Sequence, residues 1–568
     1  MSKAPRFSVR GLETHTRQMW EWEHVKRLLE FAARTNLNTL VFHQNDLIDQ
    51  AVYPEQYLSR EMMKKDFPVY MHLTENNRYY LRKVAHNARA LGIDFYLEVK
   101  ELWYRTYLLR NYPELMQNGA LCPNHPFWWE YLPVKLENLF EHIPELSGII
   151  VSIASKESRL SLRNTRCRCE LCRQTPAEAW YRKVIEAMYR PIRQAGRRLI
   201  IRDFVWSPQD LDEVVSAAES APSDVVISLK YTPHDYYPNF PHNPRIGKVG
   251  NHEQWIEYDV WGQYFGWGVF PCILLDDMKR RMAYALSRGA TGFIARTDWE
   301  CISEGSAIDS INKLNLYGTA MLSNNLGTDP RAIYEAWLTH PVSTSFSASD
   351  VATYGGIEKD PLQVDIAKLQ AILQETWPVM EKGTYLGGCV FQEFSMFPRS
   401  LEDAWWMMEE NQSLADWDPS KQSVLAMTPE NVKALIAEKA EALAKVKDLC
   451  QRVREDNNRM GLTPQFYADL VTTFEMYVRY IDGFFHSAKA CLLTKYWLTT
   501  GTDDAKRDAT QAIQELAETA GRLRGTISRT KVPHYVHMLL DPYRLDGLAR
   551  DLQGHMEEGS KRLSRTAG

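Results

Sequence analysis

The stretch "GIIVSIASKES", residues 148–158, starts as a strand and ends in a polar cluster. Residues 148–153 are almost all apolar and β-branched, which is typical of a parallel strand that is buried on both faces. Ser155, Lys156, Glu157 and Ser158 follow at once. Charged residues directly after a buried strand are unexpected unless they have a function. The rest of the chain indicates what that function is.

Seven further segments have the same apolar, β-rich character. They are residues 7–13, 37–43, 93–99, 198–206, 224–231, 254–260 and 291–296. Amphipathic helices lie between most of them, and two of these helices are followed by glycines in C-cap positions, Gly92 and Gly289. Eight strand–helix units over about 320 residues predict an α/β fold of the (β/α)₈ TIM-barrel type. A doubly wound sheet is the alternative, but no Gly-rich phosphate loop follows the first strand.

After residue 330 the strand pattern stops and long helices follow, among them residues 428–457. A segment from Thr463 to about Leu498 predicts another helix or a kinked pair. We therefore expect a barrel domain over residues 1–330 and an all-helical C-terminal domain over residues 331–568. The helical domain has no cluster of acidic or histidine residues that would make a catalytic site, so we expect it to pack on the barrel and to form a homodimer. A loop that lends residues to the barrel mouth is the less favoured role.

The composition excludes several classes of protein. A net charge of -5 gives no reason to expect nucleic acid or an anionic membrane as a partner. No apolar run approaches the roughly 20 residues that span a bilayer, and the start of the chain has no signal-peptide h-region. Most of the nine cysteines are scattered singly, as in a reducing compartment. We expect a cytoplasmic protein.

Polar side chains follow nearly every predicted strand. Catalytic groups of a barrel lie at the carboxyl ends of the strands, because the βα loops build that face. The candidates that bind substrate there are His43, Asn45, Asp46, Glu98, Trp103, Arg202, Lys230, Glu257, Gln263, Asp298 and Trp299. An acid-rich pocket walled by tryptophans is typical of a sugar site, and glycoside hydrolysis needs two carboxyl groups beside the scissile bond.

Several segments, taken in order, resemble glycoside hydrolase family 67, the α-glucuronidases. "LLEFAARTNLNTLVFHQND" (28–46) resembles that family's helix and Asn-rich strand tip, and "CPNHPFWWEYLPVKLENLFEHIPELSGIIVSIASKES" (122–158) resembles its fourth-strand region. "LIIRDFVW", "LKYTPHDYY" and "QWIEYDVWGQYFG" resemble its next three strands. "KLNLYGTAM" and "LGTDPRAIYEAWL" resemble the segment that joins its barrel to its helical domain. The resemblance covers roughly residues 8–340 and implies a hydrolase-like barrel.

The resemblance implies that Glu157 is the general acid and Asp235 a general base, with Arg202 and Lys230 lining a uronic-acid pocket. This chain departs from the family at three positions: Gln263 replaces a second base glutamate, Ser152 replaces a carboxylate-binding lysine, and Glu157 lies one residue late. The family's β-rich N-terminal domain has no counterpart here. Lys156 could be the displaced cation. A general acid needs a raised pKa, which burial or nearby carboxylates would give Glu157.

A cysteine-rich loop, "RNTRCRCELCR", follows the fourth strand and contains Cys167, Cys169 and Cys172. This spacing can chelate zinc, but a structural zinc site needs four ligands. Cys122 or His125 could join only if the two loops meet, so bound metal, free thiols and a disulfide all stay open. A bound metal would pin the loop beside the active site. The chemistry itself requires no metal or organic cofactor.

Three functions remain. The favoured one is an inverting, exo-acting glycoside hydrolase that removes a terminal sugar from a glycoside or small oligosaccharide, with a uronic acid as one candidate. Gln263 and Ser152 favour a second hypothesis. In it, an enzyme of the same fold acts on a neutral, amino or modified sugar, or works by a retaining mechanism. The third is a non-catalytic barrel that binds carbohydrate.

Overall fold

The computed structural model describes residues 6–261, 268–299, 305–339, 364–411, 413–529 and 534–566. Eight parallel strands close into a barrel, in the order β1-β10-β9-β8-β7-β6-β3-β2. The strands are β1 (Val9–Thr14), β2 (Thr39–His43), β3 (Asp94–Val99), β6 (Gly148–Ser152), β7 (Arg198–Arg202), β8 (Val226–Lys230), β9 (Gln254–Asp259) and β10 (Gly292–Arg296). All eight predicted strands are confirmed.

Helices cover the outside of the barrel. They include α1 (Trp22–Arg34), α4 (Pro68–Ala90), α6 (Phe127–His142), α8 (Ala177–Gln194), α9 (Pro208–Glu219), α10 (Leu275–Ser287) and α11 (Lys313–Asn324). The apolar faces predicted from their periodicity point inward; in α1, for example, Val25, Leu28 and Leu29 are buried. Residues 231–253, all of which the structure describes, form a helix-free loop between β8 and β9.

The first and last strands of the barrel pair with each other, and this pairing closes it. The register of β1 against β10 runs from Val9 opposite Gly292 to Glu13 opposite Arg296. Beyond the strands, the Thr297 amide donates to the Glu13 carbonyl at 2.8 Å. We call this β1–β10 junction the seam of the barrel.

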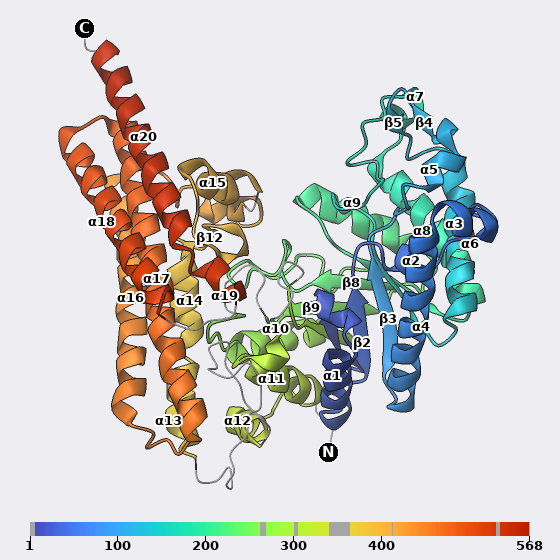
Figure 1. Ribbon diagram of the computed structural model, residues 1–568, viewed down its shortest axis with the longest axis horizontal. Coiled ribbons are helices and arrows are strands. Elements are labelled where there is room, and N and C mark those ends of the chain that lie inside the picture. The colour runs from blue at the N-terminus through green and yellow to red at the C-terminus, as the bar shows by residue number, and fades with distance from the viewer. Residues whose placement is uncertain are drawn as a thin grey trace.

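The described chain beyond α12 (Pro330–Leu338) is mainly helical, with one short hairpin of β11 (Tyr385–Leu386) and β12 (Cys389–Val390), and this confirms the predicted fold class. Long helices form a bundle beside the barrel (Figure 1): α16 (Pro429–Asp456), α17 (Pro464–Thr500), α18 (Asp503–Ile527) and α20 (Pro542–Thr566). The second predicted helix is the single 37-residue helix α17. The bundle shares one apolar core with the barrel, where the Phe270 ring stacks on Tyr480 with centroids 4.6 Å apart. The division into two domains at residue 330 stays a prediction.

One part of the helical region reaches the barrel mouth. Phe394 packs on Trp299, with ring centroids 4.9 Å apart. Tyr385 lies against Tyr237 of the β8–β9 loop, and in the same loop Asn239 donates to the backbone carbonyl of Gly388. The helical region therefore supports the β8–β9 loop directly.

Within the described residues, we find no helix that combines the length and the apolar character needed to cross a membrane.

Candidate active site

The interior of the barrel is layered, because alternate residues of each strand point inward. The first layer is apolar. It contains Val41, Tyr96, Ile150, Ile200, Val226, Trp255 and Ile294, with Val9 beside them. Two residues further along the same strands the sequence becomes polar, and this second layer contains His43, Glu98, Ser152, Arg202, Ser228, Glu257 and Arg296. Another two residues lead to a third layer at the mouth, which includes Lys100, Phe204 and Lys230.

Arg202 links the second layer together. Its Nε lies 2.8 Å from a Glu98 oxygen and 2.6 Å from a Glu257 oxygen. Its other nitrogens donate to Ser152 Oγ at 3.2 Å and to the Tyr236 hydroxyl at 2.6 Å. The sequence predicted that Arg202, Glu98 and Glu257 bind substrate, yet they bind one another and are at most 2% exposed. Opposite charges that face inward from different strands pair across the barrel, where the low dielectric strengthens their attraction.

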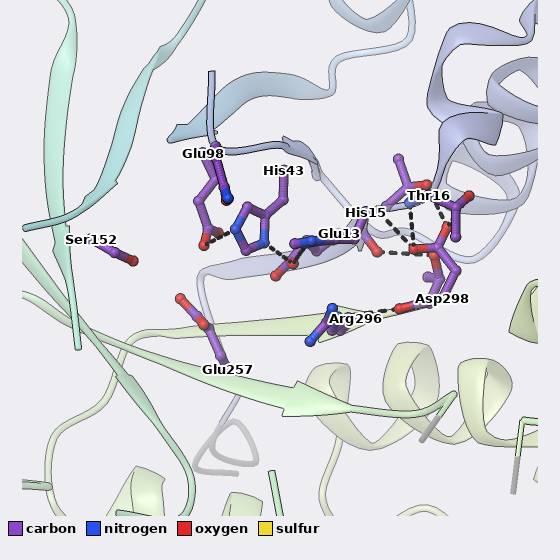
Figure 2. Close-up of polar contacts among 12 residues, drawn as sticks. Glu13, His15, Thr16, His43, Glu98, Ser152, Glu257, Arg296 and Asp298 are labelled. Atoms are coloured by element: carbon purple, nitrogen blue, oxygen red, sulfur yellow. Dashed lines mark hydrogen bonds and ion pairs between the residues drawn. The ribbon is translucent and has the colours of Figure 1, made fainter. Parts of the chain in front are cut away.

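His43 lies between Glu13 and Glu98 in the same layer (Figure 2). Its Nδ1 is 2.7 Å from Glu13 Oε1, and its Nε2 is 3.2 Å from Glu98 Oε1. Burial raises the pKa of Glu98 well above its ordinary value, and Glu13 and Glu257 add to this rise although Arg202 opposes it. Burial also lowers the pKa of His43 well below its ordinary value. His43, which was predicted to contact substrate, is 2% exposed and lies beneath the mouth, so its contact with substrate stays a prediction.

Two groups in this region have the spacing of metal ligands. Ligand atoms of Glu13, Glu98 and Glu257 all lie within 4.8 Å of one another, as do those of Glu13, His15 and His43. Arg202 already supplies positive charge between two of the carboxyl groups. Burial raises the pKa of Glu13, but its hydrogen bond with His15 and the charge of Arg296 outweigh that effect and leave this pKa below its ordinary value. Arg202 and Arg296 supply positive charge beside these carboxyl groups, and we assign no metal to the layer.

Asp298 holds the seam of the barrel. Its carboxyl accepts hydrogen bonds from the His15 amide and the Thr14 hydroxyl, both at 2.6 Å (Figure 2). Burial raises the pKa of Asp298 to about 7. Trp299, its neighbour, is 2% exposed and packs on Phe394. Asp298 and Trp299 were predicted to bind substrate. In the structure Asp298 bonds within the seam and Trp299 is buried against Phe394, and substrate binding by either residue stays a prediction.

The two predicted catalytic residues lie at the mouth, each paired with a lysine that lies over the Phe204 ring. Lys100 and Lys230 flank this ring, with Nζ atoms 4.6 Å and 4.0 Å from its centroid. Lys100 donates to the Glu157 carboxylate, and Lys230 donates to Asp235 Oδ1 at 2.6 Å. The structure therefore brings Glu157 and Asp235 together as two lysine-paired carboxyl groups.

The electrostatics of Glu157 differ from the expectation. Burial raises its pKa, but the charge and the hydrogen bond of Lys100 outweigh burial, so the pKa lies below its ordinary value. Asn45 adds a hydrogen bond to the same oxygen at 3.3 Å. Lys156, the candidate for the displaced cation, has its Nζ 4.9 Å from the centroid of the Trp206 ring. The cation that controls Glu157 is Lys100, a strand-end residue that was not among the predicted site residues.

Asp235 is held in an unusual backbone conformation. Its φ is +43°, in the left-handed region that Asp and Asn tolerate better than most residues. The Thr232 hydroxyl donates to the Asp235 carbonyl at 2.6 Å and stabilises this turn. Burial lowers the pKa of Lys230, which pairs with the Asp235 carboxyl. Outliers of this kind cluster at functional sites, where the surrounding structure holds them in place.

A cavity of about 590 Å³ opens beside Glu157 at the carboxyl ends of β1, β2 and β3. The predicted residues Asn45, Asp46, Trp103 and Glu157 line it. Burial raises the pKa of Asp46. The lining also includes residues that were not predicted, namely His15, Arg17, Met19, Trp20 and Gln44. Most of these come from the loop after β1. Its sequence "HTRQMW" combines basic and aromatic residues, and this combination could have indicated a binding loop.

The remaining predicted residues are Gln263 and the cysteines of the loop after β6. Gln263 falls outside the residues that the structure describes. Cys167, Cys169 and Cys172 gather with Cys122, away from the barrel interior, whereas His125 accepts a hydrogen bond from the Phe127 amide.

Comparisons with known proteins establish the fold. No protein-family model matches the chain, and no curated protein matches it in sequence, so the resemblance to glycoside hydrolase family 67 stays a hypothesis. A solved GH138 enzyme targeting pectin rhamnogalacturonan II has a similar structure, with a TM-score of 0.60 at 11% identity. The match covers 92% of this chain and 62% of that enzyme, so the chain spans less than two thirds of its length.

Two other glycoside hydrolases are less similar. A GH115 4-O-methyl-α-glucuronidase gives a TM-score of 0.44 at 11% identity, over 97% of this chain and 62% of that one. An O-GlcNAc hydrolase mutant of Thermobaculum terrenum gives a TM-score of 0.39 at 14% identity. The match covers 97% of this chain and 94% of that one.

Proposed function

We propose that this protein is an exo-acting, inverting glycoside hydrolase, with Glu157 as general acid and Asp235 as general base. The observation that carries the proposal is the placement of Glu157. Its side chain is 40% exposed and lines a polar cavity at the carboxyl-terminal mouth of a (β/α)₈ barrel. Trp20 and Trp103 line the same cavity and can pack on the apolar face of a sugar ring. The fold shared with the GH138 enzyme is compatible with this chemistry.

The two carboxyl groups suit a two-carboxyl mechanism. One must give a proton to the glycosidic oxygen, and the other must take a proton from the attacking water. Lys230 favours the ionised form of Asp235, which a base requires. Glu157 has the opposite need, because an acid must be protonated, yet Lys100 favours its ionised form.

A sugar that carries a carboxylate resolves this conflict. Its carboxylate would compete with Glu157 for Lys100, and its negative charge would then raise the pKa of Glu157. Arg17 lines the cavity and offers a guanidinium fork that matches a carboxylate in geometry. We therefore favour a terminal uronic acid as the substrate class. Small oligosaccharides or simple glycosides would fit a cavity of this size.

A neutral sugar is the second candidate, and the contacts of Arg202 favour it. Arg202, which the family resemblance assigned to the uronic-acid pocket, donates to Ser152 and pairs with Glu98 and Glu257. That guanidinium is therefore engaged within the protein.

The test is a panel of glycosides with uronic, neutral and amino sugars, each as an activated aryl glycoside and as an oligosaccharide. NMR of the first product reports its anomer, and inversion supports the proposal. Glu157→Gln should reduce turnover of oligosaccharides by roughly 10²–10⁴-fold and affect activated aryl glycosides much less, because their leaving group needs no proton. Glu186→Gln, an exposed glutamate on α8, is the matched control. Equal losses on both substrate types would contradict the role of Glu157.

A further inference from the structure

Four cysteines from two separate loops meet outside the barrel. Cys122 follows the short hairpin of β4 (Met116–Gln117) and β5 (Ala120–Leu121), whereas Cys167, Cys169 and Cys172 surround the start of α7 (Glu170–Gln174). Figure 1 shows β4, β5 and α7 together at one end of the barrel domain. The four Sγ atoms all lie within 4.8 Å of one another. The sequence left open whether these loops meet, and the structure places them in contact.

The sulfur spacing matches tetrahedral metal coordination. Zinc–sulfur bonds of about 2.3 Å at tetrahedral angles place neighbouring sulfurs about 3.8 Å apart. The Sγ of Cys122 lies 3.8 Å from that of Cys169 and 3.5 Å from that of Cys172. A disulfide requires about 2.05 Å, and the cysteines are unbonded thiols here.

We propose that Cys122, Cys167, Cys169 and Cys172 bind one structural Zn²⁺. Four thiolates complete a tetrahedral shell and leave no position for water or substrate, which is the pattern of structural rather than catalytic zinc. His125 is not part of the set, since its Nδ1 accepts the Phe127 amide at 3.3 Å. The site lies apart from Glu157 and Asp235 and does not depend on the proposed hydrolase activity.

The groups around the sulfurs suit thiolates. The Cys172 amide points at Cys169 Sγ over 3.4 Å, and the Asn124 side-chain amide points at Cys172 Sγ over 3.5 Å. The Asn124 amide also donates to Thr175 Oγ1 at 3.2 Å, which fixes its orientation. Donors of this kind orient and stabilise metal ligands from the second coordination shell.

The charge of the loop also fits. Four thiolates and one Zn²⁺ carry a net charge of −2, which is costly at a half-buried position without nearby cations. The loop supplies Arg166, Arg168 and Arg173, each within two residues of a ligand cysteine, and all three are exposed. The arginines of the cysteine loop would thus offset the negative charge of the zinc–thiolate centre, and they need no nucleic-acid partner to explain them.

The zinc would fasten two loops that run together from the barrel mouth. The loop after β3 and the loop after β6 bond to each other, with the Leu102 amide donating to the Leu160 carbonyl at 3.3 Å. Ser158, next to Glu157, donates to the Glu101 carbonyl at 3.0 Å. Near the cysteines, Thr165 Oγ1 donates to the Leu121 carbonyl at 3.2 Å. Zinc at the far end would hold this pair of loops in register, because metal binding stabilises the folded arrangement of its ligands.

The test measures metal directly. The full chain is purified under reducing conditions without chelators or a polyhistidine tag, and zinc is quantified by mass spectrometry. We expect one zinc per chain in the wild type and only a trace in Cys122→Ser and Cys169→Ser. Cys450→Ser is the matched control: it is a buried free cysteine on α16, and its variant should retain the full zinc content.

A second measurement keeps the test valid if a variant fails to fold. Zinc is removed from the wild type with a chelator, and Co²⁺ is added anaerobically. A thiolate-to-cobalt charge-transfer band with intense d–d bands is expected for a tetrahedral four-thiolate site, as is a lower thermal unfolding midpoint for the metal-free protein. Absence of zinc together with absence of the cobalt spectrum overturns the proposal. So does iron in place of zinc, a disulfide among the four cysteines, or full zinc content in both ligand variants.

Discussion

Lys100 and Glu157 form an ion pair that joins the loop after β3 to the loop after β6, and the two side chains differ in burial. The Lys100 side chain is 3% exposed and the Glu157 side chain is 40% exposed. The cation is fixed within the barrel mouth, whereas its partner faces the cavity. A substrate can therefore contact Glu157 before it contacts Lys100. It can replace Lys100 as the partner of Glu157 while the lysine stays in place.

Removal of this lysine should shift the pH profile. In Lys100→Met the pKa of Glu157 should rise, because burial then acts without the opposing cation. If Glu157 is the general acid, kcat/KM falls as pH rises through this pKa, so the falling limb of the profile should move to higher pH. If Glu157 acts instead as a base, the rising limb at low pH should move upward, which would contradict the assignment. Lys156→Met is the control and should shift neither limb, since Lys156 lies over Trp206.

Loss of the charge at residue 235 should stop catalysis but not folding. Asp235→Asn keeps the shape of the side chain and tolerates the φ of +43°, so the turn should survive. Turnover should fall by roughly 10²–10⁴-fold while substrate binding changes little. Azide should restore part of the activity, and the anomer of the glycosyl azide should show inversion. Asp212→Asn, on the exposed side of α9, should keep full activity; full activity in Asp235→Asn would place the base elsewhere.

Asp298 should make stability depend on pH. Its folded-state pKa of about 7 lies above its ordinary value of 3.8, so the folded state holds a proton that the unfolded state has lost between these values. Its stabilisation is complete below about pH 4 and is lost as pH rises through 7. Between pH 5 and pH 8 this amounts to a loss on the order of 2 kcal/mol in the free energy of unfolding.

Asp298→Asn should remove that dependence, because the amide stays neutral and can still accept from the His15 amide and donate to Thr14. Urea unfolding followed by tryptophan fluorescence at pH 5 and pH 8 measures the difference. A variant as pH-dependent as the wild type would show that Asp298 is ionised in the folded protein at both pH values.

A homodimer through the helical region stays a prediction. The long helices bury their apolar faces in one core, but Trp406, Leu498 and Tyr543 are 45%, 40% and 71% exposed. Light scattering at micromolar concentration should give twice the chain mass of 65.8 kDa, and Trp406→Glu with Tyr543→Glu should give monomer. Tyr79→Glu, on the barrel helix α4, should leave the dimer intact. A wild-type mass of one chain would contradict the prediction.

The alternation of strands and helices was sufficient to predict the barrel. Each strand is a run of β-branched or aromatic residues, and each helix has an apolar face, so local patterns carry this information. The inward-pointing residues also follow from the period of two, as Ile200 and Arg202 of β7 and Phe204 just beyond its end illustrate.

Local sequence patterns do not predict which other side chain each inward-pointing side chain contacts. Arg202 and Lys230 look alike at the ends of their strands, yet Arg202 is enclosed by Glu98 and Glu257 while Lys230 reaches Asp235 at the mouth. Such pairs form between residues far apart in the chain, and so does the meeting of Cys122 with Cys172, 50 positions later. Their formation depends on the paths of loops that have no periodic signal.

The seam has a consequence for synthesis on the ribosome. Thr14 and Asp298, which bond across it, are 284 positions apart. At translation rates of about 5–20 residues per second, β1 waits roughly 15–60 s for its partner β10 to emerge. Throughout that interval β1 has an unpaired edge, a form of strand that readily pairs with other chains. Nascent chains that stall before residue 298 should therefore depend on chaperones, whereas chains that pass it can close the barrel.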